Sequence, residues 1–264
     1  MMTQRDLLAN DPEFELRKGV YCSKSYADTT FECDYNPLRS QEGRLYDDAT
    51  VLRLPKFSGP APLEREWEVR SQSAKKLSDY LRTTRPRLIV EVGCGNGWLT
   101  HYLAAAVPSE CWGIDVNTLE LEQAARVFNH RDEVCFLNLD ISRTGKTFFS
   151  ADVIVVAGAV QYFPDLPQII TRLTEHLARG GEIHILDSPL YASTAEAGAA
   201  RDRSRAYFAS KNSTQMAQRY FHHCIQALSD FRYTIVDGPG TFDPLMKDAV
   251  RNEHGVFSWV RIKK

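Results

Sequence analysis

An apolar stretch that breaks directly into closely spaced glycines most constrains the fold of this chain. Residues 89–97 read Ile-Val-Glu-Val-Gly-Cys-Gly-Asn-Gly, and a helix-compatible segment that begins with Trp98 follows at once. This order predicts a buried strand, a tight turn and a helix. The turn has no side chains at its glycines, so a ligand can approach its backbone closely.

Two acidic residues are expected to face this turn. Glu91 lies at the end of the predicted strand, and Asp115 ends a second short buried strand over 111–115. In an open parallel sheet, an acid at the carboxyl end of the second strand accepts hydrogen bonds from ribose hydroxyls. Acids beside a bare glycine turn suit a ligand that carries an ammonium group and hydroxyls, and they repel a pyrophosphate.

With Glu91, the glycine turn and Asp115 in register, the segment resembles the nucleotide-binding half of class I S-adenosylmethionine-dependent methyltransferases. The resemblance rests on motifs over residues 88–187, and on architecture alone over 63–87 and 188–264. It implies an enzyme that transfers a methyl group from S-adenosylmethionine to a small-molecule acceptor and releases S-adenosylhomocysteine.

The resemblance also implies which residues hold the cofactor. Glu91 and the turn would bind its methionine end and ribose, Asp115 would bind the ribose diol, and Val116 would pack on the adenine. Alternatively, Glu91 caps the following helix, Asp115 only ends a strand, and Trp98 packs in the core. The residues implied up to this point are Glu91, Gly93, Cys94, Gly95, Asn96, Gly97, Trp98, Asp115 and Val116.

Two later segments complete the implied cofactor site. Asp140 would accept a hydrogen bond from the adenine amino group, and the backbone amide of Ile141 would donate to the ring. The carbonyls of Ala157 and Gly158 would receive the ammonium group. Asp140 has an alternative role in ordinary turn chemistry, which is common directly after a strand.

The whole chain shows an alternation of strand and helix patterns that predicts an α/β fold. We expect a Rossmann-like, seven-stranded methyltransferase sheet, mostly parallel with an antiparallel C-terminal strand, and with helices on both faces. Residues 63–264 would form the methyltransferase domain. The expected strands cover 88–92, 111–115, 134–139, 152–157, 182–187, 231–237 and 256–262, and the expected helices between them cover 98–106, 118–129 and 165–179, the last ended by Gly180-Gly181.

Residues 1–62 differ in composition from the rest of the chain, because they are polar, rich in Tyr and interrupted by Pro and Gly. We expect an extended flap over the active site, with β-like pieces at 29–33 and 50–54 and no long amphipathic helix. A partly disordered leader is the alternative. Residues 188–230 are expected to form a helical lid, with helices over roughly 193–209 and 213–228.

Candidate catalytic residues lie in and beside this lid. His222 and His223 are adjacent on the predicted helix, where neighbouring side chains diverge by about 100°, so one of them can face a pocket. We favour His222 as the general base; alternatively, one histidine is solvated and the other is packed. Asp187 and Tyr191, after the fifth strand, and Tyr162, in the loop over 157–163, are the other candidates.

Composition excludes several function classes. The net charge is -2 over 264 residues, which gives no electrostatic footprint for nucleic acid. The apolar runs are strand-length, so no membrane association is expected, and the N-terminus lacks the apolar region of a signal peptide. Six cysteines without a Cys-x-x-Cys spacing favour reduced thiols in the cytoplasm. No metal is predicted, although Asp140, Asp165 and Asp187 leave a magnesium site open.

The loop after the predicted fourth strand limits the classes of acceptor that the enzyme could methylate. It reads Ala-Gly-Ala-Val from Ala157, where enzymes that methylate amino groups of bases show Asn/Asp-Pro-Pro-Tyr/Phe. Many aromatic residues in the flap and lid favour a small organic acceptor. Three alternatives stay open: a protein or RNA substrate beside a basic rim, a nucleotide-dependent oxidoreductase, and a non-methylating binder of the same cofactor. The rim would come from Arg201, Arg203, Arg205 and Lys211.

Overall fold

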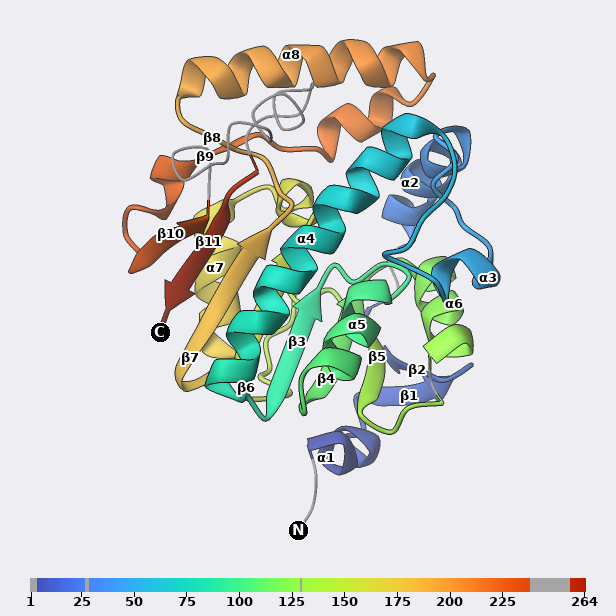
Figure 1. Ribbon diagram of the computed structural model, residues 1–264, viewed down its shortest axis with the longest axis vertical. Coiled ribbons are helices and arrows are strands. Elements are labelled where there is room, and N and C mark those ends of the chain that lie inside the picture. The colour runs from blue at the N-terminus through green and yellow to red at the C-terminus, as the bar shows by residue number, and fades with distance from the viewer. Residues whose placement is uncertain (1–3, 27–28, 129, 238–256) are drawn as a thin grey trace.

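Strands made of continuous apolar residues occupy the middle of the sheet, because both of their faces are buried. The computed structural model describes residues 4–26, 29–128, 130–237 and 257–264, and in these residues nine strands form one sheet (Figure 1). Their order across the sheet is β1-β2-β5-β4-β3-β6-β7-β11-β10. The strands are β1 Phe14–Arg17, β2 Val20–Ser23, β3 Leu88–Val92, β4 Glu110–Asp115, β5 Val134–Asn138, β6 Ala151–Ala157, β7 Leu177–Leu186, β10 Tyr233–Asp237 and β11 Trp259–Lys263.

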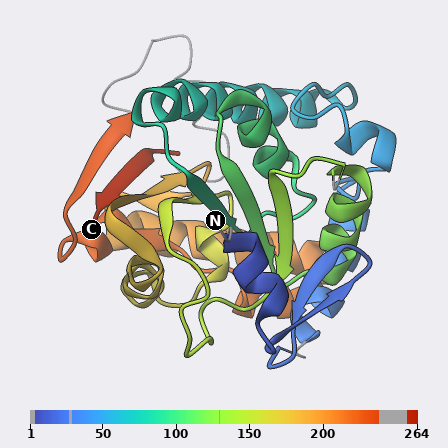
Figure 2. The same cartoon turned by 90° about the horizontal axis from the view of Figure 1, so that it is seen from below.

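Helices cover both faces of this sheet, which confirms the predicted α/β architecture. One face carries α4 (Ala61–Thr84), α5 (Trp98–Ala106) and α6 (Thr118–Phe128), and the other carries α7 (Leu166–Glu175), as Figures 1 and 2 show. Each face has its own buried apolar cluster. Burying one large aliphatic side chain contributes roughly 1.5–3 kcal/mol, so these two layers hold the domain together.

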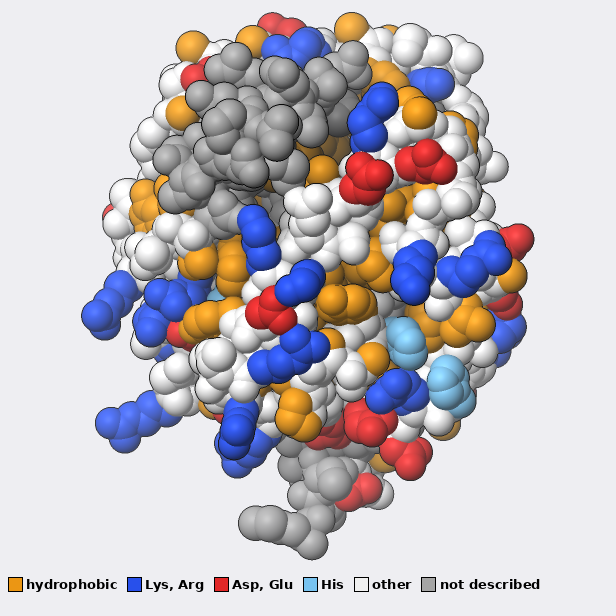
Figure 3. Space-filling view, in the orientation of Figure 1, with side chains coloured by type: hydrophobic (Ala, Val, Ile, Leu, Met, Phe, Trp, Pro, Cys, Tyr) orange, Lys and Arg blue, Asp and Glu red, His pale blue; other side chains and the backbone are white. Residues whose placement is uncertain are grey.

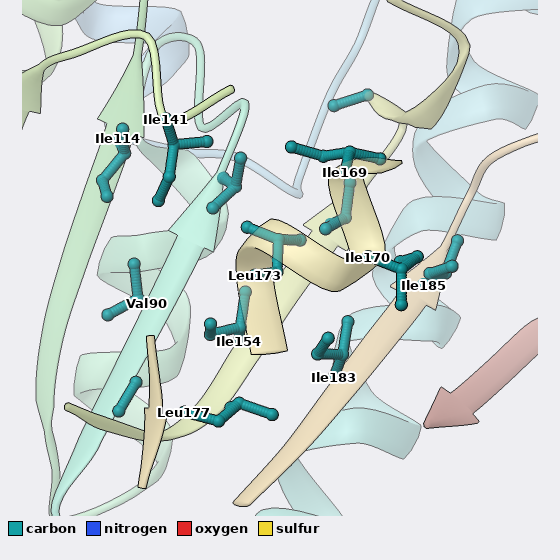
Figure 4. Packing of buried hydrophobic residues seen from close by; sticks show 14 of the residues in the cluster. Val90, Ile114, Ile141, Ile154, Ile169, Ile170, Leu173, Leu177, Ile183 and Ile185 are labelled. Carbon is teal, nitrogen blue, oxygen red and sulfur yellow. The ribbon is translucent and has the colours of Figure 1, made fainter. Parts of the chain in front are cut away.

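Alternation along β3 shows how the sheet sorts its side chains between the two layers. Val90 packs in the cluster under α7, together with Ile154 of β6 and Leu173 of α7 (Figure 4). Ile89 packs in the opposite cluster, under α4 and α5. Because side chains alternate along a strand, Glu91 lies on the same side as Ile89. The strand thereby carries its one acid toward α5.

The two edges of the sheet differ from the central parallel strands. At one edge, β11 runs antiparallel to both β7 and β10, which confirms the predicted antiparallel C-terminal strand; residues 238–256, where the prediction placed its start, lie outside the described part. At the other edge, the β1–β2 hairpin pairs in parallel with β5 through β2. These strands raise the count above the predicted seven. The hairpin satisfies backbone groups of β5 that would otherwise form an open edge.

The N-terminal segment contains helices where β-like pieces were expected. Residues 29–33 enter α2 (Thr30–Gln41), and residues 50–54 enter α3 (Asp48–Val51) and the turns after it; α1 spans Gln4–Asn10. The prediction of β-like pieces at these positions was therefore wrong. In α2 only Leu38 is buried, and Pro37 lies inside the helix, so its sequence shows no apolar stripe. Tertiary contacts rather than helix propensity stabilise such a helix.

The segment after β7 agrees with prediction in its first half only. It contains α8 (Thr194–Ser210), close to the predicted range. Residues 213–228, predicted as one helix, form two short 3-10 turns, η2 (Thr214–Gln218) and η3 (Ile225–Leu228), on either side of β9 (His223–Cys224). Here β9 pairs with β8 (Leu190–Tyr191), and this ladder replaces the helical hydrogen bonds.

Glycines at the end of α7 also act differently from the prediction. The helix ends at Glu175, and Gly180 and Gly181 lie inside β7, where the pairing with β6 shifts register. Gly180 has a φ of +77°, which only glycine adopts without strain. No helix in the described ranges is both long and apolar enough to cross a membrane.

Candidate cofactor and acceptor site

The loop between β3 and α5 needs glycine for two separate reasons. Gly93, Gly95 and Gly97 have φ values of +78°, +51° and +74°. A Cβ on Gly93 would lie 2.4 Å from the Cβ of Ala159, and one on Gly97 would lie 2.6 Å from the ring of Phe136. The loop is therefore pressed against its surroundings on one side and presents bare backbone at the carboxyl edge of the sheet.

Asp115 contacts this loop directly, as the sequence pattern indicated. Its Oδ2 accepts a hydrogen bond from the Gly95 backbone N–H at 2.8 Å, and its Oδ1 accepts from Val116 N at 2.7 Å and from Asn117 N at 2.8 Å. Burial raises the pKa of Asp115, while the three N–H donors act in the opposite direction. The end of β4 and the glycine loop thus form one unit.

Glu91 is buried beneath the same loop. It is 3% exposed, and its Oε2 accepts from Thr100 Oγ1 at 2.5 Å, in the first turn of α5. This contact agrees with the alternative in which Glu91 caps the helix. Burial raises the pKa of Glu91 to about 8, with the charge of Asp115 adding to the effect. A nearby cation would favour its ionised form.

Glu120 is a third acid at this site, and it was not among the residues predicted from the sequence. It lies in the first turn of α6, and both of its oxygens are 3.5 Å from the position of a Cβ on Gly95. Asn117 Nδ2 donates to it at 3.0 Å. Burial and the charge of Asp115 raise the pKa of Glu120 to about 7. Acids in the first turn of a helix are common for dipole reasons, so the sequence carried no specific signal.

Helix α2 lies across the start of α6, next to these acids. Glu32 Oε1 accepts from the backbone N and the Oγ1 of Thr118, at 2.9 and 2.8 Å. Asn117 Nδ2 donates to Asn36 Oδ1 at 2.7 Å. Tyr35, on the same helix, has a phenol whose pKa is raised by desolvation and by the negative charge of Glu120, while the positive charge of Arg39 acts in the opposite direction.

The loop after β6 forms the next part of the site. Gly158 has a φ of +64°, and the short 3-10 turn η1 (Val160–Tyr162) follows it. Gln161 Nε2 donates to the Gly158 carbonyl at 2.6 Å, so this predicted acceptor of the ammonium group already has one donor. Ala157 is the last residue of β6 and pairs with Leu186 of β7.

Asp187 lies beside this loop, and so does an arginine that the sequence analysis did not single out. Asp187 has a φ of +48°, and its Oδ1 accepts from Ser73 Oγ of α4 at 2.7 Å. Both terminal nitrogens of Arg70 are 3.6 Å from the position of a Cβ on Gly158. Burial raises the pKa of Asp187, and the positive charge of Arg70 opposes that rise.

The paired histidines lie in extended backbone instead of a helix, so that prediction was wrong. His223 Nε2 lies 2.9 Å from the Phe163 carbonyl, and because a carbonyl only accepts, this nitrogen is the donor. Burial lowers the pKa of His223, which favours the neutral ring. His222 Nε2 lies 2.9 Å from Ser204 Oγ of α8. Neighbouring residues in extended backbone point to opposite sides, so the two rings still diverge.

The two tyrosines named as catalytic candidates lie in different surroundings. Tyr191 is buried in β8, its ring centroid is 5.8 Å from that of His222, and burial raises its pKa. Tyr162 lies at the end of η1 and accepts a hydrogen bond from Arg39 of α2. Tyr162 therefore links the loop after β6 to the N-terminal segment.

Several residues of the implied cofactor site have structural partners of their own. Trp98 is buried edge-on against Trp67, with ring centroids 5.1 Å apart. Ile141 is a core residue beside Ile114 (Figure 4). Asp140 Oδ1 accepts from Ser142 N at 3.0 Å, as in the turn alternative.

Cys94 and Asn96, between the glycines, also have local structural roles. Cys94 is buried, and its Sγ lies 2.7 Å from the position of a Cβ on Gly113, so β4 needs glycine there. Asn96 Oδ1 accepts from Trp98 N at 3.4 Å. Within the described residues, no group of three or more His, Cys, Asp or Glu side chains could hold a metal ion.

Comparison with known proteins agrees with this geometry. Residues 90–183, which run from β3 to β7, match the family model described as a methyltransferase domain. These residues are therefore similar to a methyltransferase domain. The match covers the glycine loop, Asp115 and the loop after β6, and it leaves the N-terminal segment and residues 188–264 outside.

Curated relatives match this chain over part of its length. A trans-aconitate 2-methyltransferase of Deinococcus radiodurans is 29% identical over 119 residues, which are 45% of this chain and 44% of the relative. One from Methylobacterium radiotolerans is 30% identical over 128 residues, which are 48% of this chain and 47% of the relative. The match thus spans less than half the length of these relatives.

Solved structures share the fold over nearly the whole chain. Magnesium protoporphyrin IX methyltransferase from Synechocystis PCC 6803 with bound SAH has a TM-score of 0.58 at 14% identity, with coverage of 90% of this chain and 100% of that one. N-methyltransferase NodS from Bradyrhizobium japonicum WM9 in complex with SAH has a TM-score of 0.53 at 19% identity, covering 90% and 99%. At these identities the likeness concerns the fold.

Proposed function

We propose that this protein is an S-adenosylmethionine-dependent methyltransferase that acts on a small-molecule acceptor. One observation carries the proposal: Glu91, Asp115 and Glu120 gather around a glycine loop at the carboxyl ends of β3 and β4. Three acids with raised pKa values suit a ligand with two positive charges. The cofactor carries such charges on its sulfonium and ammonium groups.

The residues present fit this cofactor. Asp115 would bind the ribose diol, with Val116 and Asp140 toward the adenine, and Glu91 would lie below the methionine end. Arg70, above Gly158, is the cation best placed to bind the methionine carboxylate. When bound, S-adenosylmethionine supplies a methyl group on a positively charged sulfur.

The role of the chain's own residues is then to position the acceptor, exclude water and accept a proton. The bond from the acceptor atom to the methyl carbon forms as the sulfur–carbon bond breaks. If the acceptor atom carries a proton, His223 or His222 can accept it. His223 contacts the carbonyl of Phe163 in the loop after β6, and the His222 ring is 5.2 Å from that of Tyr220. Asp187 is held by Ser73 and would orient the acceptor.

A small acceptor is favoured by the elements beyond the strand ends. In Figure 1 the parallel strands point upward, and α2 and α8 lie above their carboxyl ends. Arg219, which follows η2, pairs with Asp34 of α2 at 2.7 Å. Tyr35 and Tyr220 both pack on Tyr162. Helix α2 and the segment after α8 therefore form a cover beside the loop after β6. On the face in Figure 3, basic side chains are interspersed with acidic ones, unlike a surface for RNA. The two trans-aconitate methyltransferases also support a small acceptor.

Titration calorimetry with S-adenosylhomocysteine and S-adenosylmethionine tests the proposal, with NADH as the competing ligand. We expect both adenosyl compounds to bind with affinities on the order of micromolar and NADH to give no signal. If NADH binds and neither adenosyl compound does, the proposed function is wrong.

A further inference from the structure

A chain of ion pairs joins α2, which lies above the strand ends, to α4, which covers one face of the sheet. Arg39 Nη1 lies 2.6 Å from Glu42 Oε2, and Arg44 Nε lies 3.3 Å from the same oxygen. Arg44 Nη2 lies 2.6 Å from Glu66 Oε2, and Arg70 Nη2 lies 3.0 Å from Glu66 Oε1. Three guanidinium groups alternate with two carboxylates, so the chain has an excess positive charge and ends in an arginine on each side.

Both ends of this chain reach the loop after β6. At one end, the terminal nitrogens of Arg70 lie 3.6 Å from the position of a Cβ on Gly158. Arg39 donates to the hydroxyl of Tyr162, and its guanidinium carbon is 4.7 Å from the centre of the Tyr35 ring. The Nε of Arg39 is buried and has no hydrogen-bond partner among the described residues. A buried guanidinium N–H without an acceptor is costly, so the site is incomplete without a further acceptor atom.

Aromatic rings continue from Arg39 along the cover. The rings of Tyr35 and Tyr162 are 5.8 Å apart, those of Tyr162 and Tyr220 are 5.7 Å apart, and those of Tyr220 and His222 are 5.2 Å apart. All four residues are only partly buried. This row of rings, which we call the aromatic row, runs from the acids of the cofactor site to the lid.

We propose that the acceptor bears a carboxylate that Arg39 binds, and that its planar body lies against the aromatic row. The inference rests on the proposed function and specifies its acceptor. A planar carboxylate matches the fork of a guanidinium and accepts two N–H bonds at once. With Arg70 assigned to the carboxylate of the cofactor, the two ends of the ion chain would bind the two carboxylates on either side of the methyl group.

The test uses the full chain saturated with S-adenosylhomocysteine. Calorimetry compares benzoate, trans-cinnamate and trans-aconitate with benzamide and trans-cinnamamide, which keep the aromatic shapes and lack the charge. We expect at least one acid to bind and each aromatic acid that binds to do so at least tenfold more tightly than its amide. Arg39→Gln should abolish this preference, Arg39→Lys should retain part of it, and Arg65→Gln, an exposed arginine of α4, should leave it unchanged.

The outcomes separate this inference from the proposed function. Failure of the wild-type protein to bind S-adenosylhomocysteine would contradict the proposed function. If that ligand binds but no acid does, or acids and amides bind equally, the inference is wrong. If Arg39→Gln still prefers acids over amides, Arg39 has a purely structural role, and the inference is again wrong. If Arg39→Gln does not fold, Arg39→Lys decides, because a point charge without the fork should weaken acid binding about tenfold.

Discussion

The side-chain Oδ2 of Asp115 and the backbone nitrogen of Gly95 are 2.8 Å apart and joined by a hydrogen bond. This contact ties the end of β4 to the middle of the loop after β3. The two strands are already neighbours in register, with Glu91 opposite Gly113. The carboxylate therefore shapes the loop and stays at the carboxyl edge of the sheet, where its remaining lone pairs can meet ligand hydroxyls.

Replacing Asp115 should weaken ligand binding. We expect Asp115→Ala to reduce the affinity for S-adenosylhomocysteine by about 1–3 kcal/mol, since the ribose hydroxyls lose their acceptor. Calorimetry measures the change. Asp202→Ala, which removes an exposed acid of α8, is the matched control and should bind like the wild type. Equal binding by Asp115→Ala would remove this residue from the cofactor site.

Glu91 should make stability depend on pH. Burial raises its pKa from 4.5 to about 8, so the folded protein binds more protons at this residue than the unfolded chain does between those pH values. Its contribution to stability is thus fully present below pH 4.5 and is lost as pH rises toward 8. Glu91→Gln should have a higher Tm than wild type at about pH 9 and approach it at about pH 5.

Thermal denaturation of the ligand-free protein across this pH range measures the effect. Glutamine still offers an oxygen to Thr100, so the packing is retained. A Tm difference that does not change with pH would show that Glu91 is ionised in the folded protein.

Binding of a cation should release protons from the same acids. The pKa values of Glu91 and Glu120 are raised to about 8 and about 7. A sulfonium and an ammonium nearby favour both ionised forms, so affinity for S-adenosylmethionine should increase as pH rises from about 6 to about 8. Calorimetry in buffers of different ionisation enthalpy counts the protons.

S-adenosylhomocysteine is the control ligand for this measurement, since it lacks the sulfonium charge and should release fewer protons. Glu120→Gln should reduce the release further. An affinity for S-adenosylmethionine that does not change between these pH values would contradict the prediction.

Substituting two glycines should distinguish the cost of backbone strain from the cost of a steric clash. Gly97 and Gly43 both have positive φ, at +74° and +67°, but a Cβ on Gly97 would meet Phe136 and Ala124, whereas one on Gly43 has nothing within 4 Å. We expect Gly43→Ala to cost about 1 kcal/mol and Gly97→Ala about 2–4 kcal/mol. Urea unfolding gives both values. Equal costs would mean that Phe136 moves aside freely.

Much of the central sheet was predictable because its signals are local. An apolar run, three glycines and a helix follow one another within 88–106, and each element needs only its neighbours to be recognised. The acid at the end of the next strand could be placed as well, because parallel strands bring their carboxyl ends to one edge. The same logic applies to Asp187, which follows β7 and lies beside Gly158 of the loop after β6.

The cover could not be predicted in this way. Helix α2 has one fully buried residue and an internal proline, so its pattern resembles a loop. Its helical form depends on contacts with Thr118 and Asn117, more than 80 positions away. The histidine segment was predicted as helical because its spacing permits a helix, but pairing with β8 gives it extended backbone.

The sequence by itself determined that a glycine loop and two acids meet at the end of a parallel sheet, because strand periodicity and chain direction impose this. Only the tertiary structure decided that Glu120, Arg39 and Arg70 join them. Each of these side chains is unremarkable on its own helix, and its role comes from charges and rings that distant segments place beside it.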